Sequence, residues 1–349
     1  MAYHSSVGCD LGGDQPTGYA TPSACFHTPE ITITLYGKVN VSYENYDNGT
    51  DDQWELNSNA SRIGVKGALD LDFQNVQAIY QAEFEIDVDN GDSGGGETFD
   101  QRNIYGGFTH ANLGTLIAGK FDTPFKKAQL DVDLFDNLGG DISSILGGEE
   151  RVSNIIQYST PKLADVITLN LAMIPGEGDD KAGETRDNAA DAFSSSVVFD
   201  NGTIFGAVAY DSEVTTNIYD ADFAGIGEDL YLVDAVRVSG GARIQNFELG
   251  AIYQKSETSD DVAGMSYEDS SYILSGAFSL NRLKLKAQYG LTSMDQTDDD
   301  LTLMALGADY KVGDKSKIFG YYANAEADEN TSSLEDTYFG VGFEHKFSM

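Results

Sequence analysis

The sequence predicts an all-β protein, a transmembrane antiparallel β-barrel of about sixteen strands with one loop folded inward. Three observations predict this class. Apolar and polar residues alternate along most of the chain, short and long connections alternate, and one long segment combines apolar anchors with carboxylates. The composition agrees, because proline is rare (6) while tyrosine (19) and phenylalanine (18) are common.

The alternation begins at Ile31 and continues to Phe347. A period of two gives a strand one apolar and one polar face. Charged side chains on the polar faces are tolerable in a membrane only if water fills the interior. Examples are Lys38, Glu83, Glu85 and Lys284. Segments 203–211 and 301–310 differ from the others, because they carry apolar residues on both faces.

The connections between the predicted strands fall into two length classes. The short ones are Asp70–Asn75, His110–Asn112, Asp200–Gly202, Asn281–Arg282 and Gly313–Lys315. The long ones are Asp87–Thr98, Pro175–Asp191, Ser212–Asp229, Ser256–Glu268 and Asp328–Asp336. Tight turns at one end and long loops at the other are typical of an outer-membrane barrel. The alternative, a soluble acidic all-β binding protein, predicts loops of similar length at both ends and a dry interior.

Charge and motifs exclude several functions. A formal net charge of −36 argues against binding nucleic acid. No apolar run reaches about 18 residues, so no transmembrane helix is predicted. The histidines lack metal-ligand spacing, and neither a G-x-S-x-G elbow nor a P-loop occurs. We therefore expect no enzyme activity, no catalytic residues, no metal and no cofactor.

Residues 1–30 lack strand alternation and contain both cysteines, Cys9 and Cys25. They lack the basic start and apolar stretch of a secretory signal. We interpret them as a leader or disordered extension, ahead of a barrel domain over 31–347. A loop closed by a Cys9–Cys25 disulfide is the alternative.

A segment at about 122–153 breaks the strand pattern, with the carboxylates Asp131, Asp133, Asp136 and Asp141 among apolar residues. Long loops in compact domains usually serve a function. The apolar residues would hold this one against a surface, which folding into the barrel mouth provides. They are Leu130, Leu134, Phe135, Leu138, Ile142, Ile145 and Leu146. A surface loop with a short helix is the alternative.

Five motifs resemble the general porins, a family of trimeric sixteen-stranded barrels in Gram-negative outer membranes. In order, they are Leu35-Tyr-Gly-Lys38, Ser61-Arg-Ile-Gly-Val-Lys-Gly67, Gln101-Arg-Asn-Ile-Tyr-Gly-Gly107, Leu113-Gly-Thr-Leu-Ile-Ala-Gly119 and Arg151-Val-Ser-Asn-Ile-Ile-Gln-Tyr158. The resemblance covers nearly all of 31–347. The chain departs from it at its end, where Ser348 and Met349 follow Phe347 in place of a terminal aromatic residue.

The resemblance implies a pore constriction between a basic wall and an acidic loop. The wall residues would be Lys38, Arg62, Arg102 and Arg151. On the loop, Asp133 and Asp141 match acidic positions and Asp136 lies close to another, while Asn137 stands where a relative can carry a carboxylate. Alternation independently places Lys38, Arg62 and Arg102 on polar faces. Each basic residue could instead form a structural ion pair with a lumen carboxylate.

The implied function is passive diffusion of ions and small hydrophilic solutes across the bacterial outer membrane. The implied partners are outer-membrane lipid, lipopolysaccharide and two further copies of the chain in a homotrimer. We expect a preference for cations that is set at the constriction. A substrate-specific channel, for sugars or phosphate, is the alternative within the same fold.

Overall fold

The computed structural model describes residues 31–89, 99–181, 184–219, 231–262, 264–297, 299–328 and 333–349. The predicted extension, residues 1–30, lies outside these ranges. Strands make up most of the described chain, and the helical elements are one turn of α-helix, α1 (Pro124–Lys127), and a 3₁₀ turn, η1 (Ile142–Ser144). No helix in the described ranges is long and apolar enough to cross a membrane.

The strands of the first half precede and follow the long inward loop. They are β1 (Ile31–Asp47), β2 (Asp52–Ser58), β3 (Arg62–Asp70), β4 (Gln77–Glu85), β5 (Asp100–His110), β6 (Gly114–Asp122), β7 (Arg151–Ser159) and β8 (Ile167–Ile174). A separate small hairpin, β9 (Asp179–Lys181) and β10 (Glu184–Arg186), follows β8.

The strands of the second half are longer. They are β11 (Ala192–Asp200), β12 (Ile204–Thr216), β13 (Tyr231–Ile244), β14 (Phe247–Thr258), β15 (Glu268–Leu280), β16 (Leu283–Met294), β17 (Asp300–Gly313), β18 (Ser316–Asp328) and β19 (Ser333–Ser348). β12 and β14 run past the expected starts of their loops, to Thr216 and Thr258.

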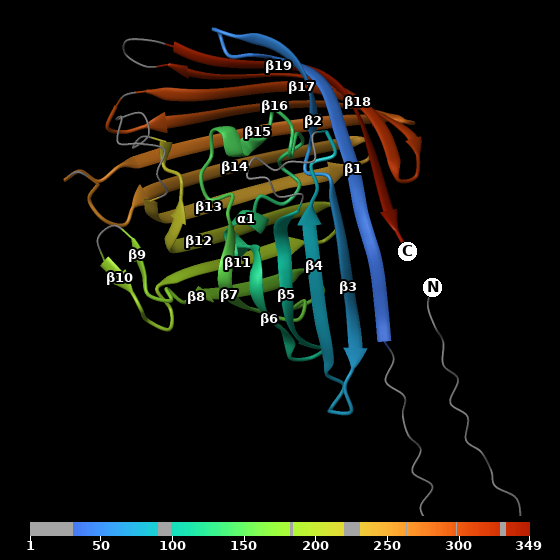
Figure 1. The fold of residues 1–349 in the computed structure, drawn as a ribbon, viewed down its shortest axis with the longest axis vertical. Coiled ribbons are helices and arrows are strands. Elements are labelled where there is room, and N and C mark those ends of the chain that lie inside the picture. The colour runs from blue at the N-terminus through green and yellow to red at the C-terminus, as the bar shows by residue number, and fades with distance from the viewer. Residues whose placement is uncertain are drawn as a thin grey trace, which may run out of the picture.

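The strands form a closed antiparallel barrel (Figure 1). Each strand pairs with its neighbours in the chain, β8 pairs with β11 across the small hairpin, and β1 closes the ring on β19. β1 also pairs with both β2 and β3, which are two halves of one strand position interrupted at 59–61. The barrel therefore has the predicted sixteen strand positions.

The two faces of the strands differ as the alternation predicts. On β1, Lys38, Asn40 and Ser42 are buried inside, whereas Ile33 (60% exposed) and Tyr43 point outward. The outer face is an apolar surface in which aromatic rings pair across strands, as in the stacked rings of Tyr43 and Trp54, 5.0 Å apart. Because successive strands are antiparallel, the connections predicted to be short lie at one end of the barrel and those predicted to be long lie at the other. The last predicted long loop, Asp328–Asp336, is shorter than expected, because β18 ends at Asp328 and β19 already begins at Ser333.

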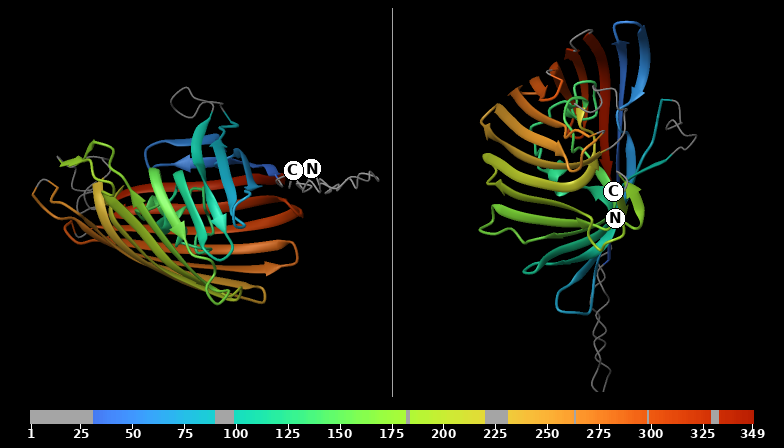
Figure 2. Two further views of the ribbon diagram at one scale, coloured as in Figure 1. Left: turned by 90° about the horizontal axis from the view of Figure 1, so that it is seen from below. Right: turned by 90° about the vertical axis from the view of Figure 1, so that its left-hand side faces the viewer.

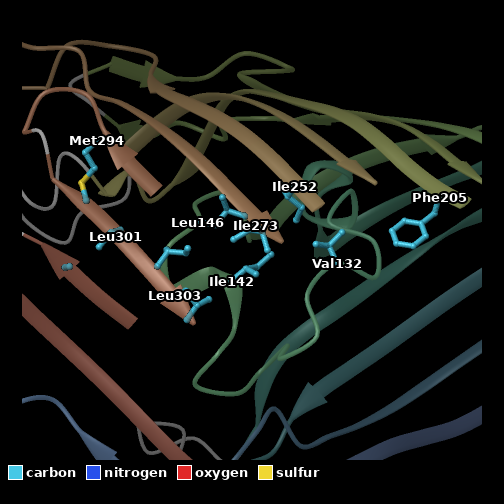
Figure 3. Close-up of a cluster of buried hydrophobic side chains, with 11 residues drawn as sticks. Val132, Ile142, Leu146, Phe205, Ile252, Ile273, Met294, Leu301 and Leu303 are labelled. Atoms are coloured by element: carbon cyan, nitrogen blue, oxygen red, sulfur yellow. The ribbon is translucent and has the colours of Figure 1, made fainter. Parts of the chain in front are cut away.

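The connection between β6 and β7, residues 123–150, lies inside the barrel against β12–β18 (Figure 2). Its apolar residues Val132, Ile142 and Leu146 pack on the inner faces of the wall strands (Figure 3). This packing explains the two segments with two apolar faces. On β12, Phe205, Ala207 and Ala209 contact the loop region, and on β17 Leu301, Leu303 and Ala305 do so.

Candidate pore constriction

The loop and the facing wall enclose a water-accessible cavity of about 770 Å³ in the barrel. Six of the seven predicted site residues line it: Arg62, Arg102 and Arg151 from the wall, and Asp133, Asp136 and Asp141 from the loop. The seventh, Lys38, points inward from β1, opposite Arg62 in the β1–β3 register, and is buried. The structure therefore brings the predicted basic and acidic residues to one level of the barrel.

The arginines of the wall are held by carboxylates of neighbouring strands. Glu83 on β4 lies 3.0 Å from Arg102 Nε and 3.6 Å from Arg62 Nη1. Its other oxygen accepts a hydrogen bond from the Tyr36 hydroxyl at 3.0 Å. Arg102 also pairs with Glu85. These contacts order the guanidinium groups and neutralise part of their charge.

Arg151 is held by a second group of wall residues. Its Nη2 lies 3.0 Å from Asp122 Oδ1, and its Nε donates to Asn103 Oδ1 at 3.3 Å. Asn103 Nδ2 donates to Asp122 Oδ2 at 3.0 Å. Arg151 and Asp122 are the residues at which β7 begins and β6 ends, so the pair lies at the base of the inward loop.

Arg102 reaches the lumen through a β-bulge. Ala82 pairs with Ile104 and Phe84 with Gln101, so Arg102 and Asn103 together oppose the single residue Glu83. Strict alternation from the outward-facing Phe108, 53% exposed, would have turned Arg102 outward. A bulge re-aims side chains in this way. Arg102 therefore lines the cavity because of the bulge and not because of strict alternation along β5.

The three loop carboxylates lie close together, with one oxygen of each within 4.8 Å of the others. Backbone N–H groups hold two of them: Phe135 N donates to Asp133 Oδ1 at 2.9 Å, and Asn137 N and Ser143 N donate to Asp141. Within the described chain, none of the three has a basic partner within 4.0 Å. The loop thus presents a cluster of three carboxyl groups without a basic partner in the described chain.

Burial and mutual repulsion raise the pKa of two members of this cluster, Asp133 and Asp136. Burial, and next the Asp141 carboxylate, raise the pKa of Asp133 well above its usual value. Burial and Asp141 also raise the pKa of Asp136, although Lys38 and Arg62 act in the opposite direction. Lys38 and Arg62 are therefore the wall cations whose charges act most strongly on Asp136.

The cluster is also the one place in the described ranges where three possible metal-ligand residues converge. Carboxylate oxygens suit hard divalent cations, but Ca²⁺ takes six to eight oxygens. Three monodentate carboxylates supply fewer, so water would have to complete the coordination.

The charge balance differs across the passage. The three wall arginines pair with Glu83, Glu85 and Asp122 on their own wall, so their charges are balanced there, while Lys38 has no carboxylate within 4.0 Å among the described residues. The loop adds three carboxylates without a cationic partner among the described residues. The sequence did not identify Asp122, Asn103 or Lys126 as lining or supporting residues. Asp122 ends β6, Asn103 lies at the bulge of β5 and Lys126 lies in α1, and nothing in the local sequence pattern marks a role for them.

A closed barrel with a charged, water-accessible passage and an apolar outer surface defines a membrane channel. The model of the Gram-negative porin family matches residues 19–331. The chain belongs to that family. It is an outer-membrane protein through which solutes pass by passive diffusion.

Solved structures of porins share the fold. The anion-selective porin from Comamonas acidovorans matches with a TM-score of 0.75 and 20% identity, over 91% of this chain and 100% of that one. The trimer form of OmpT from Vibrio cholerae gives 0.65 and 18%, over 91% and 99%. Salmonella typhi OmpF gives 0.65 and 11%, over 90% and 97%. No curated protein shows a significant sequence match.

Proposed function

We propose that this channel is a non-specific pore that prefers cations, with the preference set by the inward loop. The observation that carries the proposal is the unequal pairing across the passage. Asp133, Asp136 and Asp141 lack a cationic partner in the described structure, whereas Arg62, Arg102 and Arg151 are paired on their own wall.

The physical consequence is a field across the passage with a net negative bias. Ions and polar solutes orient in such a field, while bulky apolar solutes are rejected by size and desolvation. The acidic outer loops also concentrate cations at the mouth, but salt screens charges beyond about 10 Å at about 0.1 M. Groups separated by only a few water molecules are screened less, so the selectivity of the constriction should survive high salt.

Reversal potentials under a salt gradient test the proposal. Replacing Asp133 and Asp141 by asparagine should lower the cation-to-anion permeability ratio. A unit charge about 4 Å from an ion contributes about 1 kcal/mol in water, which is about a fivefold effect on each ion. Because a cation and an anion respond in opposite directions, the ratio should change by up to about 25-fold. Replacing Arg62 and Arg102 by alanine should raise the ratio and widen the passage.

The matched control is Asp131→Asn. Asp131 lies on the same loop and lines the same cavity, but it is paired with Arg243, and its side chain is 60% exposed. This variant should leave the reversal potential at high salt nearly unchanged. If both double variants keep the parent reversal potential, the wall and loop charges are structural ion pairs and the proposal is wrong.

A substrate-specific channel is the second candidate. Specific sugar channels need stacking surfaces, and none of the residues lining the described cavity is aromatic. A phosphate channel would need free cations, and the cavity lysines Lys284, Lys286 and Lys317 are each paired with Glu248 or Asp309. We therefore favour the non-specific pore. Conductance that is blocked by one sugar or by phosphate at low concentration would support the specific channel instead.

We also propose a homotrimer that contacts outer-membrane lipid and lipopolysaccharide. The apolar outer face supports the lipid contact, and the trimer form of OmpT supports the assembly by analogy. Mass measurement of the detergent-solubilised, unheated protein tests the trimer.

A further inference from the structure

Arg237 on β13 is a charged residue in the barrel interior that has no place in the constriction. Its side chain is completely buried, unlike the wall arginines, and it does not line the cavity. Alternation turns it inward, because Val236 and Val238 on either side face outward. A buried guanidinium is costly unless its donors are satisfied, so its partners show what it does.

The partners of Arg237 belong to both ends of the inward loop. Its Nη1 donates to Phe125 O at 3.4 Å, in the first turn after β6 ends. Its Nη2 donates to Gly147 O at 3.1 Å, shortly before β7 begins. Its Nη1 also lies 2.6 Å from Glu149 Oε1. One side chain therefore joins the entering and leaving stems of the loop.

The wall and an aromatic ring fix the guanidinium from the other sides. Arg237 Nε donates to Gln254 Oε1 on β14 at 2.8 Å, and Gln254 Nε2 donates to the same Gly147 O at 2.9 Å. The Arg237 carbon Cζ lies 4.4 Å from the centre of the Phe125 ring. The planar group of donors matches this set of acceptors, which a single ammonium could not reach together.

We infer that Arg237 is a positioning residue, which fixes the inward loop in the lumen by clamping its two stems to the β13–β14 wall. The inference rests on the proposal that this loop sets the selectivity of the passage. It adds that the position of Asp133 and Asp141 depends on a residue that does not itself line the cavity.

The clamp does not depend on the charge of Glu149. Burial raises the pKa of Glu149 to about 7, even though Arg237 lies beside it. Phe125 O and Gly147 O accept their hydrogen bonds whichever form Glu149 takes. The backbone carbonyl groups therefore carry the clamp, and Glu149 contributes an acceptor more than a charge.

A nitroxide label on Ser144→Cys, an exposed loop position, tests the inference by electron paramagnetic resonance. Cys9 and Cys25 are replaced by serine to leave one thiol. In Arg237→Met, we expect the mobile fraction of the label to rise at least tenfold (~1.4 kcal/mol or more), because Gly147 O and Phe125 O lose a donor. Gln254→Met should give a smaller rise in the mobile fraction. This variant provides the test if Arg237→Met does not fold.

Two variants are matched controls. Arg243→Met removes an arginine of the same strand that also stacks on a phenylalanine and pairs with the loop residue Asp131, but its side chain is 30% exposed. Glu149→Gln keeps the acceptor without the charge. Both should leave the label immobile. Arg237→Lys keeps the charge but not the planar donors, so it should not restore immobility.

Heat stability of the barrel is measured alongside, because a merely structural role would lower it without mobilising the loop. An immobile label in both folded Arg237→Met and Gln254→Met would overturn the inference. So would restoration by Arg237→Lys, since charge alone would then suffice. If the loop is mobilised while Asp133 and Asp141 replacements leave selectivity unchanged, the clamp stands and the proposed function fails.

Discussion

The two walls of the passage hold their functional groups by different means. On the β3–β7 wall, the arginines are fixed by short ion pairs to carboxylates of adjacent strands, such as Glu83 and Asp122. On the opposite side, the loop is fixed by apolar packing on β12–β18 and by polar contacts to its backbone. A wall that orders charges by pairing also cancels them. Apolar docking leaves the loop carboxylates unpaired, so the loop side carries the uncompensated charge.

Phe135→Ala should have the largest effect, because it weakens the apolar packing that holds the loop against the barrel wall. Phe135 is fully buried against Ala305, Phe319 and Tyr321, and its ring lies 4.3 Å from Lys286 Nζ. Removing a buried phenylalanine ring costs about 3–5 kcal/mol. We expect a higher and noisier single-channel conductance with reduced cation preference. Leu306→Ala, on the outer face of β17, is the control and should conduct like the parent.

Acidification should neutralise the aspartates of the loop, while the arginines of the opposite wall keep their charge. Burial and mutual repulsion raise the pKa values of Asp133 and Asp136, so these groups take up protons at a higher pH than ordinary aspartates, near 3.9. The cation preference should fall as pH falls through that raised range, while the arginines stay charged. A selectivity titration with its midpoint at or below about 3.9 would contradict the assignment of these residues.

Glu83→Gln should shift the balance from the wall side by one charge. Arg62 and Arg102 would both lose a carboxylate partner. We expect the permeability ratio to move towards anions by up to about 25-fold, and by less where solvent screens the charge. Glu85 pairs with Arg102 alone and is more exposed, so Glu85→Gln should have a smaller effect in the same direction. Equal effects of the two substitutions would contradict the view that Glu83, which pairs with two arginines, balances more charge than Glu85, which pairs with one.

Deleting residues 1–30 should have the smallest effect, because neither wall as described uses them. We expect unchanged heat stability and conductance. A large loss of either would show that the extension acts as a plug or a latch, for which Cys9 and Cys25 provide a possible crosslink. Residues 1–30 would then be a third part of the passage, beside the wall and the inward loop.

Much of the fold followed from local patterns in the sequence. Alternation predicted the strands and their inner faces, and the apolar residues of 122–153 predicted an inward loop, although the strands end and begin at Asp122 and Arg151. Segments 203–211 and 301–310 carried the further signal, because their second apolar face is the surface on which the loop packs.

The remaining features depend on contacts between distant residues. The bulge at Arg102 is a property of the β4–β5 pairing, which alternation along one strand does not contain. Arg237 was missed because Val-Arg-Val has the pattern of any lumen-facing strand residue. Its partners Phe125, Gly147 and Gln254 come together only when the loop folds back. The pairing of Glu83 with two arginines is likewise a product of register.

The apolar inner faces of β14, β15 and β17 limit how the channel can be enlarged. Ile252, Ile273 and Leu303 face the inside of the barrel, where they pack against Val132, Ile142 and Leu146 of the loop. A channel without the loop would have a wider opening, and the apolar side chains that the loop covers would be exposed to the water in it. Such surfaces in narrow pores favour the loss of water and with it of ion conduction. The diameter of the pore and its hydration are therefore coupled in this channel. A wider opening need not carry a larger ion current.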